Sequence, residues 1–120
     1  MSDKYVFNIQ KELEDNPLAP GETMRLRFLK HCPHSGANVA QAKEVMPHYH
    51  KDHDEYVYIL RGNHEFRVGD EKVQVGPGDL VIAPAGLPHW PSRVGPGYAA
   101  LSIYAPDWDE SQPDRVPVDP

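Results

Sequence analysis

Cysteine is almost absent from this chain of 120 residues, and Cys32 is the only one. A single cysteine excludes a disulfide-stapled fold and any zinc finger or iron–sulfur site built from cysteines. No run of about 18 apolar residues occurs either, so we expect no membrane partner. Lysine and arginine number 12 against 18 acidic residues, and this balance argues against binding to nucleic acid. Residues 1–10 lack the apolar core of a secretory signal, so we expect a cytoplasmic protein.

Long helical patterns are missing too, because 13 prolines and 9 glycines interrupt the chain. Short β-prone segments separated by turn signals predict an all-β sandwich or barrel. The predicted strands lie near residues 23–28, 55–60, 64–68, 72–75, 80–83 and 98–104. We divide the chain into an N-terminal arm (1–22) with at best a helical turn, a barrel (23–104), and an acidic, proline-rich tail (105–120). We expect the tail to be solvated or extended on a surface, with Trp108 packed on the barrel.

Histidine is abundant where cysteine is scarce, and five of the seven histidines lie between positions 48 and 89. On a strand, His48 and His50 project from the same face. Two adjacent imidazoles repel each other when protonated, so a shared face suggests a shared metal ion. Glu55 opens the next strand and can return a carboxylate beside them, and a barrel can bring His89 to the same place. Imidazole and carboxylate donors suit a borderline divalent metal.

The loop between His50 and Glu55 leaves the choice of the next ligand open. His53 or Asp54 of this loop can swing toward the ion, but strand parity places Glu55 on one face with Ile59. We therefore favour Glu55 as the ligand. We interpret His53 as a residue at the rim of the pocket, where it can contact a substrate.

Neighbouring strands supply further candidates for the pocket. If Gly62 and Asn63 form a hairpin turn, Phe66 faces Ile59 and helps to line the apolar part of the cavity. Ile59 and Phe66 are therefore candidate residues for contact with a substrate. Tyr56 and Tyr58 have the opposite parity to Glu55, so we expect them outside the barrel or at a dimer contact. The remaining histidines are interpreted as rim or surface residues: His31, His34 and His64. Three arginines can meet an anionic substrate, although surface roles are more common: Arg27, Arg61 and Arg93.

Two segments resemble the motifs of the cupin superfamily. Residues 48–62 resemble the first motif, G-x5-H-x-H-x3–4-E-x6-G, and residues 78–89 resemble the second, G-x5-P-x-G-x2-H-x3-N. Fifteen residues separate them, as in small microbial members. Ala42 replaces the leading glycine and Arg93 the final asparagine, both structural positions that vary in the superfamily. The resemblance covers residues 23–104.

This resemblance implies a cupin double-stranded β-helix, or jelly-roll barrel, with a metal held by His48, His50, Glu55 and His89. The candidate metals are Fe, Mn, Ni, Co, Cu and Zn, and four protein ligands leave two positions of an octahedral ion for water, substrate or oxygen. It implies an enzyme for a small organic molecule, with dioxygenase-like chemistry favoured over isomerase, lyase or cyclase chemistry. The alternative is a non-catalytic barrel that binds a small ligand as a sensor. Similar barrels pair through their outer sheets, so we expect a homodimer, to which residues 5–9 can add a strand.

Overall fold

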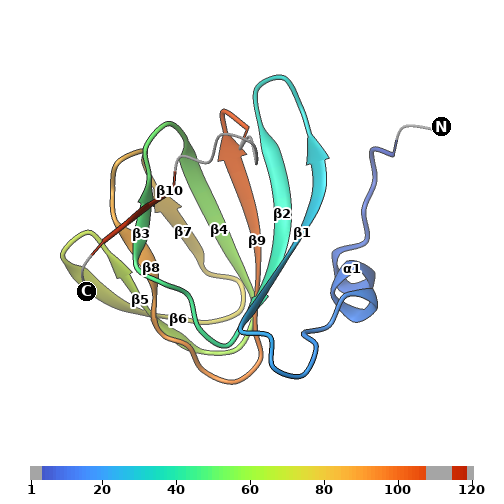
Figure 1. Ribbon diagram of the computed structural model, residues 1–120, viewed down its shortest axis with the longest axis horizontal. Coiled ribbons are helices and arrows are strands. Elements are labelled where there is room, and N and C mark those ends of the chain that lie inside the picture. Colours follow the sequence, from blue (N-terminus) through green and yellow to red (C-terminus); the bar gives the residue numbers. More distant parts are fainter. Residues whose placement is uncertain (1–3, 108–114, 119–120) are drawn as a thin grey trace.

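The computed structural model describes residues 4–107 and 115–118 and contains mainly β-strands in these ranges (Figure 1). The elements in chain order are α1 (Ile9–Asp15), β1 (Met24–His31), β2 (Gly36–Ala42), β3 (His48–His50), β4 (Asp54–Arg61), β5 (His64–Val68), β6 (Glu71–Val75), β7 (Leu80–Ala83), β8 (His89–Arg93), β9 (Tyr98–Ala105) and β10 (Arg115–Pro117). The prediction of an all-β fold is confirmed.

The strands form two antiparallel sheets that face each other (Figure 1). The first sheet has the order β1-β2-β9-β4-β7 and the second has the order β10-β3-β8-β5-β6. The turn at Gly62 joins β4 of the first sheet to β5 of the second, so the hairpin expected there is wrong. The residues of this turn suit both a hairpin within one sheet and a crossing from one sheet to the other. β4 already pairs with β7 on one edge and with β9 on the other, so β5 cannot pair with it and joins the second sheet.

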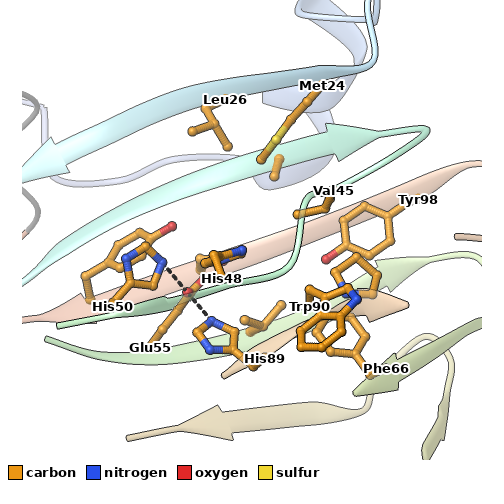
Figure 2. Close-up of a pocket in the computed structure, with 15 residues that line it drawn as sticks. Met24, Leu26, Val45, His48, His50, Glu55, Phe66, His89, Trp90 and Tyr98 are labelled. Atoms are coloured by element: carbon orange, nitrogen blue, oxygen red, sulfur yellow. Dashed lines mark hydrogen bonds and ion pairs between the residues drawn. The ribbon is translucent and has the colours of Figure 1, made fainter. Parts of the chain in front are cut away.

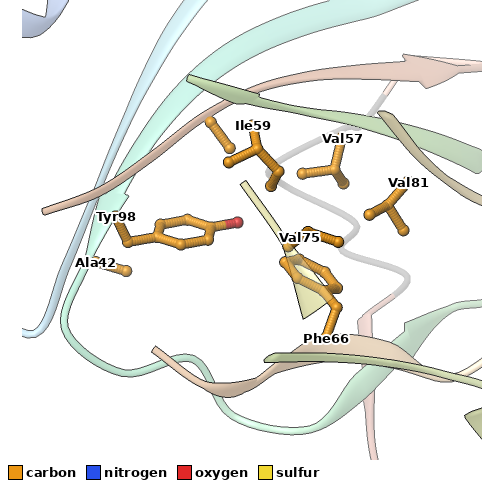
Figure 3. Packing of buried hydrophobic residues seen from close by; sticks show 8 residues of the cluster. Ala42, Val57, Ile59, Phe66, Val75, Val81 and Tyr98 are labelled. Atoms are coloured by element: carbon orange, nitrogen blue, oxygen red, sulfur yellow. The ribbon is translucent and has the colours of Figure 1, made fainter. Parts of the chain in front are cut away.

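The main core lies between the two sheets, where the inward residues of each strand meet. Ile59 is fully buried and Phe66 is 1% exposed, and both belong to this core although their strands lie in different sheets (Figure 3). The alternation of buried and exposed residues along β4 is the period of two that the sequence shows. Burial of such side chains stabilises the fold by about 1.5–3 kcal/mol each.

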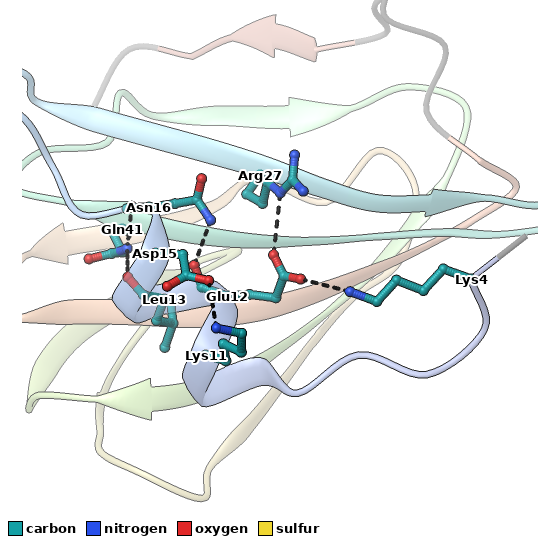
Figure 4. A network of polar contacts seen from close by, with 8 residues as sticks. All are labelled: Lys4, Lys11, Glu12, Leu13, Asp15, Asn16, Arg27 and Gln41. Atoms are coloured by element: carbon teal, nitrogen blue, oxygen red, sulfur yellow. Dashed lines mark hydrogen bonds and ion pairs between the residues drawn. The ribbon is translucent and has the colours of Figure 1, made fainter. Parts of the chain in front are cut away.

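Helix α1 covers part of the outer face of the first sheet (Figure 1). It begins at the Asn8 cap, whose side chain accepts a hydrogen bond from the Lys11 amide at 2.9 Å. Leu13 is buried against that face, and the Gln41 amide donates to the Leu13 carbonyl (Figure 4). Where at best a helical turn was expected, these tertiary contacts stabilise seven helical residues. No helix in the described ranges is long and apolar enough to cross a membrane.

The chain ends pack differently. Residues 4–8 form no strand within this chain, and Tyr5 is 73% exposed. At the other end, β10 pairs with β3, with Val116 opposite Tyr49. The expected contact of Trp108 lies outside the described residues.

The rest of the outer face of the first sheet, beyond α1, exposes large apolar side chains. They come from β4, β7 and β9 and form adjacent cross-strand pairs, as in Tyr56 opposite Ile82 and Ile103. We call this the outer patch, and its members are Tyr56, Tyr58, Leu80, Ile82 and Ile103. The prediction that the two tyrosines lie outside the barrel is confirmed.

Candidate metal centre

Four potential ligands from three strands meet at one point between the sheets. His48 and His50 project from the same face of β3, Glu55 comes from β4, and His89 lies directly opposite His48 on β8. All four residues are buried, and one donor atom from each lies within 4.8 Å of the others. The structure therefore brings together the four residues singled out in the sequence as metal ligands.

The spacing of the donor atoms fits a single metal ion. Glu55 Oε1 lies 2.8 Å from Nε2 of His89 and 3.2 Å from Nε2 of His50 (Figure 2). With metal–ligand bonds of about 2.1 Å, adjacent ligands of an octahedral ion are separated by about 3 Å. The same contacts serve as hydrogen bonds when no ion is present. The imidazole and carboxylate donors are also those that a borderline divalent metal prefers.

Backbone carbonyls orient two of the imidazoles. His48 Nδ1 donates to the Met46 carbonyl at 2.8 Å, and His89 Nδ1 donates to the Leu87 carbonyl at 3.0 Å. A proton held on Nδ1 leaves Nε2 as the atom available to a metal. Both acceptors lie two residues before the histidine, so the local chain sets the ring orientation.

The charge of Glu55 suits a cation. Burial alone raises the pKa of this carboxyl, but hydrogen bonds and charge interactions with His50 and His89 outweigh burial and hold the pKa well below its ordinary value. Glu55 is therefore ionised at neutral pH. The adjacent hydroxyl of Tyr104 accepts a hydrogen bond from Asn38 Nδ2 at 3.0 Å. Burial and the charge of Glu55 raise the pKa of Tyr104, so its phenol stays protonated.

The loop of residues 51–54 does not supply a donor to the four-residue cluster. His53 is 3% exposed, so its assignment to the pocket rim is wrong. Its ring stacks on His50 at 4.2 Å between centroids and meets the edge of Tyr104, which buries it among aromatic rings. Asp54 Oδ1 accepts a hydrogen bond from the Ala85 amide at 2.8 Å, which holds it away from the cluster.

A cavity of about 520 Å³, counted with its open mouth, lies against the four-residue cluster. Its lining includes the cluster and mainly apolar or aromatic residues: Met24, Leu26, Ala40, Val45, Val57, Phe66, Trp90, Pro91, Tyr98, Ser102 and Tyr104. Phe66 lines the cavity as expected, but Ile59 does not, because it points into the core behind the cavity wall. Tyr98 and Tyr104 were not among the residues predicted to line the pocket, although the period of two along 98–104 places both on one face of the strand, which here is the inner face.

His64 and His31 lie in very different surroundings. His64 is 2% exposed, so its interpretation as a rim or surface residue is wrong: Nε2 donates to the Arg61 carbonyl, and Nδ1 accepts from the Gly95 amide. His31 is exposed and pairs with Asp107 at 2.8 Å. None of the three candidate arginines is among the residues that line the cavity.

Comparison with known proteins identifies the family of this chain. The family model Cupin_2, described as a cupin domain, matches residues 37–104. An uncharacterized protein of Aquifex aeolicus (strain VF5) is 31% identical over 71 residues, which are 59% of this chain and 59% of that protein. The match therefore spans less than two thirds of that relative.

Solved structures with low sequence identity share the fold. A Klebsiella pneumoniae protein with a double-stranded β-helix domain has a TM-score of 0.77 at 18% identity, covering 98% of this chain and 100% of its own. KdgF from a Halomonas species has a TM-score of 0.69 at 24% identity, covering 81% and 89%. A Streptomyces PAC13 variant with uridine has a TM-score of 0.70 at 17% identity, covering 98% and 92%. The predicted double-stranded β-helix is confirmed, and this chain belongs to the Cupin_2 family of the cupin superfamily.

Proposed function

We propose that this protein is a mononuclear metal-dependent enzyme that acts on a small organic molecule. One observation supports the proposal above all: four buried donors, three imidazoles and one carboxylate, converge at the wall of a largely apolar cavity. A structural metal needs no adjacent cavity, whereas a catalytic metal needs space for a substrate.

In this proposal His48, His50, Glu55 and His89 hold one ion of Fe, Mn, Ni, Co, Cu or Zn. When bound, such an ion polarises a substrate oxygen or, if redox-active, allows chemistry with dioxygen. Glu55 lowers the positive charge of the site. The apolar walls, including Phe66, exclude water from the substrate and so strengthen the electrostatic contacts within the cavity.

The reaction class divides into an oxygen-dependent and an oxygen-independent branch. The set of three histidines and one glutamate favours dioxygenase-like chemistry. Isomerase, lyase or cyclase chemistry is the other branch, and Pac13, a structural neighbour described as a nucleoside dehydratase, supports including it. The two branches differ in their need for a redox-active metal, so metal identity and oxygen consumption separate them.

The experiment loads the protein with Fe²⁺ and measures oxygen uptake over a panel of diketones, thiols and phenols. A parallel anaerobic arm uses the Mn²⁺- and Zn²⁺-loaded protein with sugar acids and nucleosides and detects products by mass. The negative control is the double variant His48→Ala/His50→Ala, and the matched control is His34→Ala, which removes an exposed histidine. We expect turnover in one arm that the double variant loses and His34→Ala keeps. Turnover that is equal in the double variant would refute the proposal.

A small-ligand sensor without catalysis is the competing function. It predicts that a compound of the panel binds stoichiometrically and is recovered unchanged in both arms. That result would replace the enzyme proposal while leaving the metal site intact.

A further inference from the structure

Tyr98 presents a hydroxyl group to the cavity that the proposed chemistry does not use. Its side chain is 6% exposed, and its ring lies across the cavity from Glu55 with the hydroxyl directed inward (Figure 2). The ring is fixed by an edge contact with His64, 4.7 Å between centroids, and by Phe66, 6.5 Å between centroids. The direction of the hydroxyl is therefore set by packing.

The Tyr98 hydroxyl has no hydrogen-bond partner among the residues that the structure describes, whereas the Tyr104 hydroxyl accepts from Asn38. The Tyr98 oxygen is not among the fully buried atoms that lack a partner, so it is open to the cavity, where water or a ligand can pair with it. Phenylalanine would fill the same volume without placing a hydroxyl in this largely apolar wall. Burial, followed by the charge of Glu55, raises the pKa of Tyr98, so the phenol is a hydrogen-bond donor at neutral pH.

The charges around the cavity restrict what this donor can meet. No lysine or arginine is present among the described residues that line it. A divalent ion together with the ionised Glu55 has a net charge of +1. This charge balances one negative charge on the part of a ligand that lies at the metal. Because no described lining residue near Tyr98 is a lysine or an arginine, a second carboxylate or a phosphate there would be buried without a counter-charge from them.

We propose that Tyr98 Oη donates a hydrogen bond to a neutral carbonyl or hydroxyl oxygen at the end of the ligand remote from the metal. This inference rests on the proposed function, because the other end of the ligand is taken to lie at the four-residue cluster. The substrate class is a neutral or singly anionic molecule with metal-binding oxygens at one end, a neutral oxygen acceptor at the other, and an apolar frame between them. Phosphate esters and dicarboxylates fall outside this class.

The first arm of the test measures the unfolding temperature of the metal-free and ligand-free protein. Removing an unpaired hydroxyl leaves stability unchanged or higher, so we expect Tyr98→Phe to melt at or above the wild-type temperature. Tyr104→Phe, which breaks the bond to Asn38, lowers it by about 4 °C. Tyr5→Phe, which removes the hydroxyl of a tyrosine that is 73% exposed and lies outside both the cavity and the outer patch, is the neutral control. A decrease in Tyr98→Phe equal to that in Tyr104→Phe would show that the hydroxyl serves the fold and would overturn the proposal.

The second arm measures binding of hydroxamate chelators to the Co²⁺-loaded protein by visible absorbance. The probes carry a ketone on the fourth, fifth or sixth carbon, and each is paired with the hydrocarbon hydroxamate of equal length. We expect at least one ketone probe to bind wild type about fivefold more tightly than its partner, a preference that Tyr98→Phe loses and Tyr5→Phe keeps. Replacing the ketone by a terminal carboxylate should weaken binding.

The outcomes separate this inference from the proposed function. An intact cobalt spectrum with no ketone preference, or with a preference that survives in Tyr98→Phe, overturns the role of Tyr98 and leaves the metal site standing. Failure of cobalt to bind refutes the metal site itself, and this inference falls with it.

Discussion

Two glycines next to the strands β4 and β7, Gly62 after β4 and Gly78 before β7, offer a sharp test of how the side chains pack around the His64 ring. Gly62 and Gly78 both have positive φ, +83° and +93°, a region that L-residues avoid. They differ in what surrounds them. A Cβ on Gly62 would lie 2.6 Å from the His64 ring and 2.7 Å from the Pro96 carbonyl, whereas a Cβ on Gly78 would meet nothing within 4 Å.

The expected losses of unfolding free energy follow from this difference. The left-handed backbone costs about 1–2 kcal/mol in either alanine variant. At Gly62 the His64 ring must also move, which weakens its hydrogen bonds with the Arg61 carbonyl and the Gly95 amide, each 2.8 Å long. At about 1 kcal/mol for each bond, Gly62→Ala should lose about 3–4 kcal/mol and Gly78→Ala about 1–2 kcal/mol.

Urea denaturation of the metal-free variants measures both losses on one scale. We expect the midpoint of Gly62→Ala to fall clearly below that of Gly78→Ala, with equal slopes. Equal losses in the two variants would mean that backbone conformation alone determines the cost, and would refute the packing role assigned to His64.

Three further predictions concern charge, metal and assembly. Because the folded-state pKa of Glu55 lies below its unfolded value, its contribution to the stability of the metal-free protein is present above about pH 4.3 and is lost on further acidification. Glu55→Gln should therefore flatten the acidic part of a curve of unfolding free energy against pH. A curve equal to that of wild type would contradict the lowered pKa of Glu55. Since metal ligation needs neutral imidazoles, dialysis at pH 5 should remove the ion, and metal content unchanged from pH 7.5 would count against three histidine ligands. We propose that the outer patch, which contains no charged side chain in a chain of net charge −6, mediates a homodimer. Ile82→Lys should then sediment as a monomer while Val73→Lys on the other sheet remains a dimer, and a wild-type monomer at micromolar concentration would refute this.

Some features of the site could be predicted from residue spacing and others could not. The parity of His48 and His50 and the motif spacing to Glu55 identify side chains that the fold does bring together. The parity of β9 carried the same kind of signal for Tyr98 and Tyr104, because alternation along a strand is readable without its partners.

The positions of His53 and His64 could not be read in this way. Each imidazole is buried by groups distant in sequence, Tyr104 in one case and the Gly95 amide in the other. The crossing of the chain from β4 in the first sheet to β5 in the second could not be predicted either. Gly62 is compatible with a hairpin and with such a crossing, and the long-range pairing of β4 with β7 and β9 determines which of them forms. Local sequence patterns therefore predicted the four metal ligands, whereas the residues that surround His53 and His64 depend on tertiary contacts.

The most direct test of the central claim is the metal stoichiometry of the purified protein, measured by elemental analysis after equilibrium dialysis against Co²⁺ or Zn²⁺. The metal centre described here predicts one ion per chain in wild type and in His34→Ala, and a loss of binding in His89→Ala. A wild-type chain that retains no ion, or a His89→Ala variant that binds as tightly as wild type, would contradict it.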